Sequence, residues 1–175
     1  MIFTDDQGYG ELGCHGNPIL RTPNLDHLHA QSLRFTDFHV SPTCAPTRAA
    51  LMTGRHEFRS GVTHTVFERE RLSLSAVTLA ETLRASGYAT GIFGKWHLGD
   101  FYPHRPMDKG FRECVYHLGW GMLNSTPEFD WPLFDGRYFH NGVAKSFKGH
   151  CTDWWFDSAM TWIKQCKQNN EPFFC

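Results

Sequence analysis

Cys44 stands at the predicted start of a helix, and an arginine follows it one turn later. Residues 44–55 read CAPTRAALMTGR. Pro46 suits the first turn of a helix, because the N–H that proline lacks has no partner in that turn, and Gly54 can end the helix. The N–H groups and dipole of a helix start attract anions, and Arg48 lies over the same face. These groups can together hold a tetrahedral oxyanion.

Two adjacent carboxylates, Asp5 and Asp6, follow a short apolar stretch and precede glycines at positions 8 and 10. Neighbouring carboxylates repel each other unless a cation shares them, and hard cations such as Ca²⁺ bind such oxygens. An ordinary acidic turn contains the same residue types. The pair therefore indicates either a divalent metal site or a turn.

A third polar pair, Lys95 and His97, follows a predicted buried strand that ends at Phe93. In extended backbone these two side chains would point to one side and Trp96 to the other. Open α/β sheets bind ligands at the carboxyl ends of their strands, so the pair would face a ligand. The alternative is a pair of solvated residues around a buried tryptophan.

Together the three motifs resemble the type I sulfatases, the formylglycine-dependent, arylsulfatase-like enzymes of the alkaline phosphatase-like superfamily. The family signature Cys-x-Pro-x-Arg falls on residues 44–48, and the resemblance covers essentially the whole chain. It implies that Cys44 is oxidised after translation, by a formylglycine-generating enzyme, to an aldehyde that acts as its hydrate. It also implies that Asp5, Asp6 and the modified Cys44 bind one divalent cation, Ca²⁺.

The same resemblance implies hydrolysis of aryl or carbohydrate sulfate esters. One hydroxyl of the hydrate would attack sulfur, and loss of a proton from the second would expel sulfate and regenerate the aldehyde. Lys95 would bind the sulfate, His97 would take that proton, and Arg48 would orient the hydrate. The remaining metal ligands and the leaving-group acid are expected beyond residue 175. We therefore expect the chain alone to bind metal weakly and to be weakly active or inactive.

Two other functions are compatible with these residues. A phosphonate monoester or phosphodiester hydrolase of the same superfamily shares the Cys-x-Pro-x-Arg motif. A fragment that binds anions without turnover would also contain a helix start with an arginine beside it, although such a fragment need not retain all six polar residues of the three motifs.

The composition predicts a globular chain without a charge bias. Its 175 residues include 17 Lys and Arg and 18 Asp and Glu, with no basic run that would indicate a nucleic acid partner. No stretch has the length of a transmembrane helix. Six cysteines without CxxC spacing argue against a zinc ribbon or a thioredoxin-like site. Both ends lie in apolar sequence, so we expect a partial catalytic domain over residues 1–175. The resemblance implies a periplasmic, secreted or lysosomal location.

The predicted elements follow the order of α/β proteins. Apolar patterns predict strands over 1–4, 33–40, 88–93 and within 171–175. They also predict a helix capped by Asn24, a short helix after Cys44, and helices over 77–85 and 152–168. Residues 100–150 are rich in Pro, Gly and aromatics and are expected to form a loop-rich insertion or lid. With the resemblance, the pattern predicts a three-layer α/β/α sandwich of the alkaline phosphatase-like type, incomplete at both ends.

Overall fold

The computed structural model describes residues 1–119 and 132–175, which divide into two compact units. The N-terminal unit comprises Ile2–Val40, and the sheet unit comprises Met1 with Ser41–Cys175. In the sheet unit, the amino group of Met1 donates a 2.6 Å hydrogen bond to the carbonyl oxygen of Cys175.

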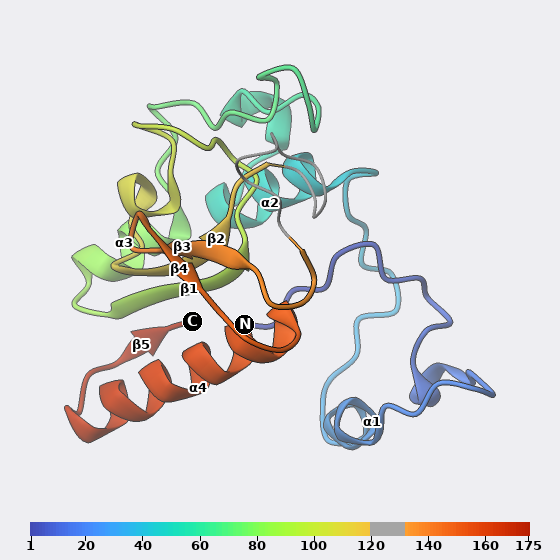
Figure 1. Ribbon diagram of the computed structural model, residues 1–175. Coiled ribbons are helices and arrows are strands. Elements are labelled where there is room, and N and C mark those ends of the chain that lie inside the picture. Colours follow the sequence, from blue (N-terminus) through green and yellow to red (C-terminus); the bar gives the residue numbers. More distant parts are fainter. Residues whose placement is uncertain (120–131) are drawn as a thin grey trace. The chain divides into compact units, whose positions relative to one another are not determined.

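A mixed sheet with the strand order β4-β3-β2-β1-β5 forms the centre of the sheet unit (Figure 1). Strand β1 (Ala89–Lys95) pairs in parallel with β2 (Glu113–His117) and with β5 (Phe173–Phe174). Strands β3 (Arg137–His140) and β4 (Val143–Ser146) continue the sheet as an antiparallel meander. The predicted strands over 88–93 and within 171–175 are therefore confirmed.

Helices cover both faces of β1. Successive residues of this strand point to opposite faces of the sheet, so its apolar side chains contact helices on both sides. Ile92 packs into the core formed with α2 (Cys44–Thr53) and α3 (Leu79–Ala85). Phe93 instead contacts Trp162 of α4 (Cys151–Gln168), with ring centroids 5.8 Å apart. The sheet thus lies between helical layers, and the predicted helices after Cys44, over 77–85 and over 152–168 are confirmed to within two residues.

Local contacts fix both boundaries of helix α3. The Thr78 hydroxyl accepts a hydrogen bond from the Glu81 N–H at 3.0 Å, and the Glu81 carboxylate accepts one from the Thr78 N–H at 2.8 Å. This capping box satisfies two donors that the helix start leaves without backbone partners. Just after the helix, Gly87 has a φ of +87°, which glycine adopts at little cost.

Residues 100–150, for which a loop-rich insertion or lid is predicted, contain strands as well as irregular segments among their described residues. A short 3₁₀ turn, η2 (Glu57–Ser60), follows α2, and another, η3 (Pro106–Lys109), precedes β2. Three of the five described strands fall within 100–150. In β2, Cys114, Val115 and Tyr116 are all at most 2% exposed. A short strand buried on both faces does not alternate, so its periodicity carries no signal. Residues 120–131 lie outside the described residues.

The predicted strands over 1–4 and 33–40 are also wrong. Both segments are irregular, and Leu33, Phe35 and Phe38 are 82%, 73% and 74% exposed. Their apolar alternation is typical of a strand, but a strand is stable only when another strand pairs with it. None of the described strands pairs with either segment.

The N-terminal unit contains one helix, α1 (Pro23–Ala30), and a 3₁₀ turn, η1 (Gly13–His15), among its described residues. The helix was predicted, but its expected cap is wrong. Pro23 is the first helical residue and Thr22 stands at the cap position, so Asn24 lies inside the helix. Proline favours this position because its fixed φ already suits a helix.

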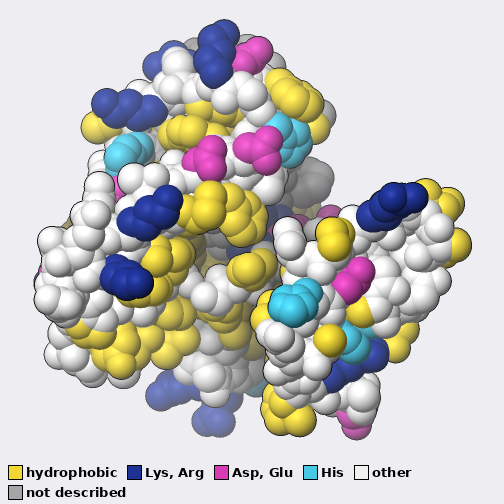
Figure 2. All heavy atoms as spheres, turned by 90° about the horizontal axis from the view of Figure 1, so that it is seen from below, with side chains coloured by type: hydrophobic (Ala, Val, Ile, Leu, Met, Phe, Trp, Pro, Cys, Tyr) yellow, Lys and Arg dark blue, Asp and Glu magenta, His cyan; other side chains and the backbone are white. Residues whose placement is uncertain are grey.

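Much of the described surface is apolar. Large hydrophobic side chains with exposed fractions above one third occur in both units, and Figure 2 shows hydrophobic side chains lying open on the face seen from below. None of the described helices combines the length and the apolar character needed to cross a membrane.

Candidate active site

Cys44 is the first residue of α2 and is partly buried. Thr43 before it has extended backbone and makes no side-chain cap, so the N–H groups of the first turn are not satisfied by that residue. Gly54 ends the helix with a φ of +63° and donates from its N–H to the Ala50 carbonyl at 2.9 Å. Cys44 therefore lies where the helix dipole favours negative charge.

Arg48 connects this helix to the end of β1. Its Nη1 donates to the carbonyl oxygen of Lys95, the last residue of the strand, at 2.7 Å. The helix start that carries Cys44 is thereby held at the carboxyl end of a strand with parallel neighbours on both sides. This is the edge at which open α/β sheets bind ligands.

His97 lies two residues beyond β1 and is 2% exposed. Its Nε2 is 2.8 Å from the carbonyl oxygen of Thr65. A carbonyl only accepts, so Nε2 carries a proton and Nδ1 is the basic atom of the neutral ring. The φ of His97 is +59°, which is not extended backbone. The alternation used to place Lys95 and His97 on one side therefore stops at Lys95.

Trp96, between these two residues, is 3% exposed and donates from Nε1 to the His104 carbonyl at 2.8 Å. It also packs edge-on against Phe111, with centroids 5.9 Å apart. A buried tryptophan belonged to the alternative interpretation of this segment, whose solvated histidine is wrong because His97 is also buried. The indole fixes the backbone on which Lys95 and His97 stand.

Asp5 and Asp6 occupy an exposed bend in the N-terminal unit, and Asp6 has a φ of +53°. Two carboxylates are donors of the right kind for Ca²⁺, which takes six to eight oxygens. They make up only part of such a set. Cys44, Arg48, Lys95 and His97 all belong to the sheet unit, so these four are the site residues that the structure places within one unit.

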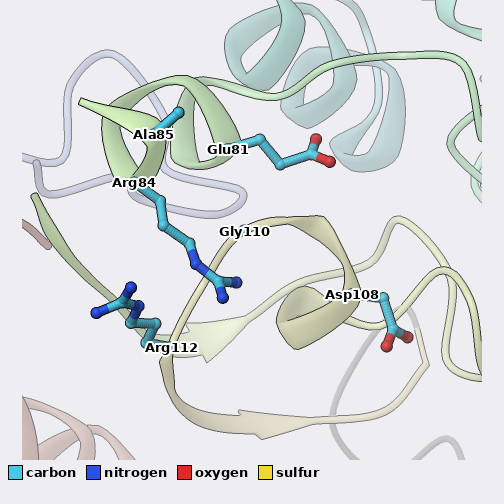
Figure 3. A pocket seen from close by; sticks show the side chains of 6 residues that line it. All are labelled: Glu81, Arg84, Ala85, Asp108, Gly110 and Arg112. Carbon is cyan, nitrogen blue, oxygen red and sulfur yellow. The ribbon is translucent and has the colours of Figure 1, made fainter. Parts of the chain in front are cut away.

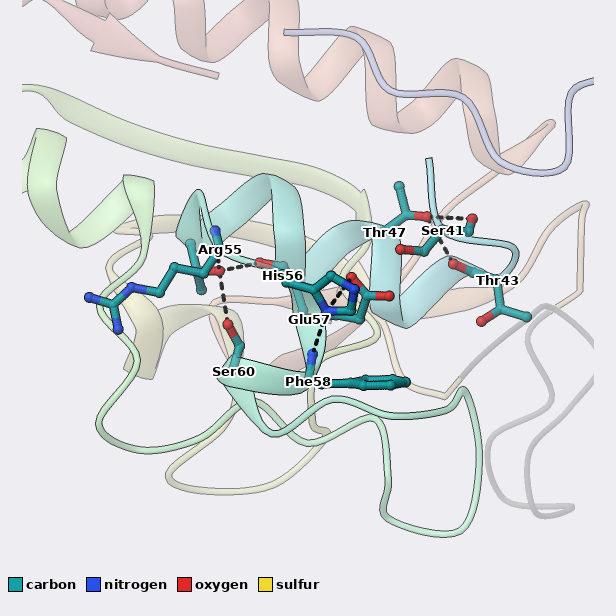
Figure 4. A network of polar contacts seen from close by, with 10 residues as sticks. Ser41, Thr43, Thr47, Arg55, His56, Glu57, Phe58 and Ser60 are labelled. Carbon is teal, nitrogen blue, oxygen red and sulfur yellow. Dashed lines mark hydrogen bonds and ion pairs between the residues drawn. The ribbon is translucent and has the colours of Figure 1, made fainter. Parts of the chain in front are cut away.

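Polar contacts fix both ends of α2 (Figure 4). Thr47 Oγ1 lies 2.8 Å from the carbonyl oxygen of Ser41 and 3.0 Å from that of Thr43, which holds the turn before Cys44. At the other end, the hydroxyls of Thr53 and Ser60 are 3.0 Å apart. Thr47 occupies a variable position of the signature, so the sequence pattern gave no reason to select it.

Two carboxyl groups near the site were also missed. Glu57, beside α2, has a pKa lowered by its backbone hydrogen bond and by the Ser41 hydroxyl. Asp100 follows His97 by three positions, and burial raises its pKa. The Gly119 N–H donates to both Asp100 oxygens at 3.0 Å, and the nearby Glu70 carboxylate raises the Asp100 pKa further. The sequence contains no motif that would have selected either group.

A polar pocket lies elsewhere in the sheet unit. Figure 3 shows it between α3 and the segment before β2, with the side chains of Glu81, Arg84, Asp108 and Arg112 around it. Arg112 directly precedes β2, so this pocket is at the amino end of that strand. Lys95 ends the parallel strand β1 at the opposite edge, and the pocket is therefore separate from the candidate active site.

A family model described as Sulfatase matches residues 1–175. The chain belongs to the sulfatase family. Among the sulfatases, arylsulfatase A of Bos taurus is 57% identical over 103 residues, which cover 57% of this chain and 20% of that protein. Arylsulfatase G of Rattus norvegicus is 44% identical over 140 residues, covering 75% of this chain and 26% of that protein. The chain thus spans about a fifth to a quarter of these curated sulfatase relatives.

Solved structures share the fold of this sulfatase chain. The crystal structure of Ps i-CgsB superposes with a TM-score of 0.83 at 29% identity, covering 97% of this chain and 42% of that one. BT4656, solved in complex with D-glucosamine-2-N,6-O-disulfate, gives a TM-score of 0.76 at 25% identity, covering 97% and 31%. The predicted α/β class and alkaline phosphatase-like architecture are confirmed.

Proposed function

We propose that this chain is the part of a sulfate ester hydrolase that carries the nucleophile, formed from Cys44. The observation that carries the proposal is the hydrogen bond from Arg48 to the Lys95 carbonyl. It joins α2, whose start attracts anions, to the end of β1, where Lys95 stands and His97 follows two residues later. The arylsulfatase relatives support the same reaction class.

Each residue then has a specific task. The N–H groups at the start of α2 and the ammonium of Lys95 bind the sulfate oxygens and offset their charge. Arg48 orients residue 44 and fixes the strand end through its bond to the backbone. His97, held through Nε2 by the Thr65 carbonyl, would accept at Nδ1 the proton of the second hydroxyl as sulfate leaves, and would then release this proton to solvent.

Two further groups, one Ca²⁺ ion and a formylglycine at position 44, complete the proposed site. Asp5 and Asp6, with residue 44, would contribute oxygen ligands to one Ca²⁺ ion. When bound, the cation offsets negative charge and acidifies a hydroxyl, and formylglycine at position 44 supplies the hydrate nucleophile. Because Asp5 and Asp6 provide too few oxygens, the other ligands would come from sequence corresponding to the rest of the relatives' length. Residues 1–175 would then form one portion of the catalytic domain.

Two further points belong to the proposal. A formylglycine-generating enzyme would be the maturation partner, and a sulfated aryl or carbohydrate ester would be the substrate. A periplasmic, secreted or lysosomal location would follow the family resemblance.

Peptide mass spectrometry on the Cys44 segment tests the proposal, after co-expression with a formylglycine-generating enzyme. We expect the mass loss of a thiol-to-aldehyde conversion at Cys44 and none at Cys14, which serves as an internal control. An unmodified Cys44 thiol, with a reference sulfatase converted in parallel, would overturn the proposal. Aryl sulfate and phenyl phosphonate rates of the full-length gene product would then separate a sulfatase from a phosphonate monoester hydrolase.

A further inference from the structure

We propose that Cys14, His15 and His29 form a second metal site in this chain, for a borderline-soft divalent cation of the zinc type. The Cys14 sulfur and one ring nitrogen from each histidine all lie within 4.8 Å of one another. All three residues are partly buried and belong to the N-terminal unit. The proposal does not depend on the proposed function.

The hydrogen bonds of the two histidines identify the ligand atoms. His15 Nδ1 lies 2.6 Å from the carbonyl oxygen of Tyr9, so this nitrogen carries the proton and Nε2 is left to bind a metal. His29 Nε2 is buried and has no hydrogen-bond partner in the described part of the chain. A buried nitrogen without a partner is costly, and a metal ion bound to it would remove that cost.

The ring of His15 is held in place from two sides. Tyr9 stacks on it with centroids 4.7 Å apart and 16° between the planes. His29 meets it edge to face, with centroids 5.8 Å apart. Zinc binds sulfur at about 2.3 Å and nitrogen at about 2.0 Å, so small side-chain rotations would bring the three ligand atoms onto one ion.

Asp26 fixes the two elements that carry the ligands. Its Oδ1 accepts from the Cys14 N–H and from the Thr22 hydroxyl, both at 2.8 Å. The Gly13 N–H in turn donates to Thr22 Oγ1 at 2.8 Å. These bonds hold η1, with Cys14 and His15, against α1, which carries His29. Supporting contacts of this kind orient ligands and raise metal affinity.

The donor set also decides which cation binds. One thiolate and two imidazoles suit zinc and disfavour calcium and magnesium, which prefer oxygen. Asp5 and Asp6 offer only oxygen, so the two sites would take different ions. Three protein ligands leave one tetrahedral position for water or another ligand. Binding would release the thiol proton of Cys14 to solvent.

Cobalt titration of the 175-residue chain tests the site, in saturating Ca²⁺ and in a background with Cys44→Ser and Cys175→Ser, which removes the two other thiols that are not fully buried. We expect one equivalent of Co²⁺ to give tetrahedral d–d bands and a thiolate-to-cobalt charge-transfer band, and Zn²⁺ to displace it. Cys14→Ser should abolish the charge-transfer band, and His29→Gln should weaken Co²⁺ binding by more than about tenfold.

His27→Gln is the matched control, because His27 lies on the same helix and is exposed. It should bind Co²⁺ as the parent does, and circular dichroism should show the same helix content in every variant. A parent chain without the charge-transfer band would overturn the proposal. So would a band that survives in Cys14→Ser, or equal Co²⁺ affinity in His29→Gln and the parent.

Discussion

Arg48 Nη1 and the carbonyl oxygen of Lys95 are joined by a 2.7 Å hydrogen bond across 47 positions of the sequence. The donor is a charged guanidinium and the acceptor ends a central strand. The bond fixes the first turns of α2 against the end of β1. A substitution at Arg48 should therefore affect the stability of the fold as well as the proposed catalysis.

Replacing Arg48 with alanine should lower the free energy of unfolding by about 1.5–3 kcal/mol, the range for a hydrogen bond from a charged group. Urea denaturation measures this change. Arg55→Ala is the control, because Arg55 is exposed near the other end of the same helix; its effect should stay within about 0.5 kcal/mol. Equal effects for the two variants would mean that the bond from Arg48 to Lys95 contributes nothing to the free energy of unfolding.

Thr78→Ala should destabilise the chain by about 1–3 kcal/mol, because it removes the cap of α3 and leaves a buried carbonyl without its donor. The Thr78 hydroxyl donates to the Lys109 carbonyl at 2.7 Å. Thermal unfolding of Thr78→Ala and Thr82→Ala provides the comparison. Thr82 is an exposed residue of the same helix, and its replacement should have little effect. A Thr82 effect as large as that of Thr78 would contradict the capping role.

Gly110→Ala should be among the most destabilising substitutions in the chain. Gly110 has a φ of +101°, and an added Cβ would lie only 2.4 Å from the backbone nitrogen of Glu81. Gly87 also has a positive φ, but open space surrounds it, so Gly87→Ala should cost only about 1 kcal/mol of backbone strain. Soluble yield and unfolding midpoints report the difference, and similar midpoints for the two variants would show that α3 can move away from Gly110.

Because of Asp100, the free energy of unfolding should fall as pH rises. Burial raises its pKa in the folded chain above the ordinary value of 3.8, so the folded state binds this proton more tightly than the unfolded state does. Its contribution is favourable below pH 3.8 and is lost as pH rises through the raised folded pKa. Asp100→Asn should therefore raise the melting temperature relative to the parent at pH 7 more than at pH 4.

Asp157→Asn, at an exposed position of α4, is the control for the loss of one carboxyl group. Melting curves of the three proteins at both pH values decide the outcome. A melting-temperature difference between Asp100→Asn and the parent that does not shift in favour of Asp100→Asn from pH 4 to pH 7 would contradict the assigned direction.

Local signals explain which elements could be predicted. Pro46 and Gly54 delimit α2 within one stretch of sequence, and the apolar face of α4 repeats at helical spacing. Strand β2 depends on partners distant in sequence, so no local pattern distinguishes it from loop. Strands β3 and β4 instead form a hairpin around Asn141 and Gly142, a local turn signal that the prediction did not use. Residues 33–40 show the converse, because they have strand periodicity and no partner.

The same distinction applies to the candidate sites. Cys44 and Arg48 share one helix turn, so their spacing alone brought them together in the prediction. The bond from Arg48 to Lys95 depends on how α2 packs against the sheet, which no spacing reveals. Cys14, His15 and His29 follow no metal-binding motif, and they are brought close by tertiary contacts such as the bond from the Cys14 N–H to Asp26.

Strand β1 has parallel partners on both sides, and both follow it in the chain. During synthesis on the ribosome, β1 therefore emerges with two open edges. The β2 edge closes first, whereas the β5 edge stays open until the whole of α4 has been translated. These long-range pairings give the unit a high contact order, which slows folding and prolongs exposure of aggregation-prone edges. We expect chaperones that recognise extended apolar chain to bind nascent sulfatase at β1 during this interval.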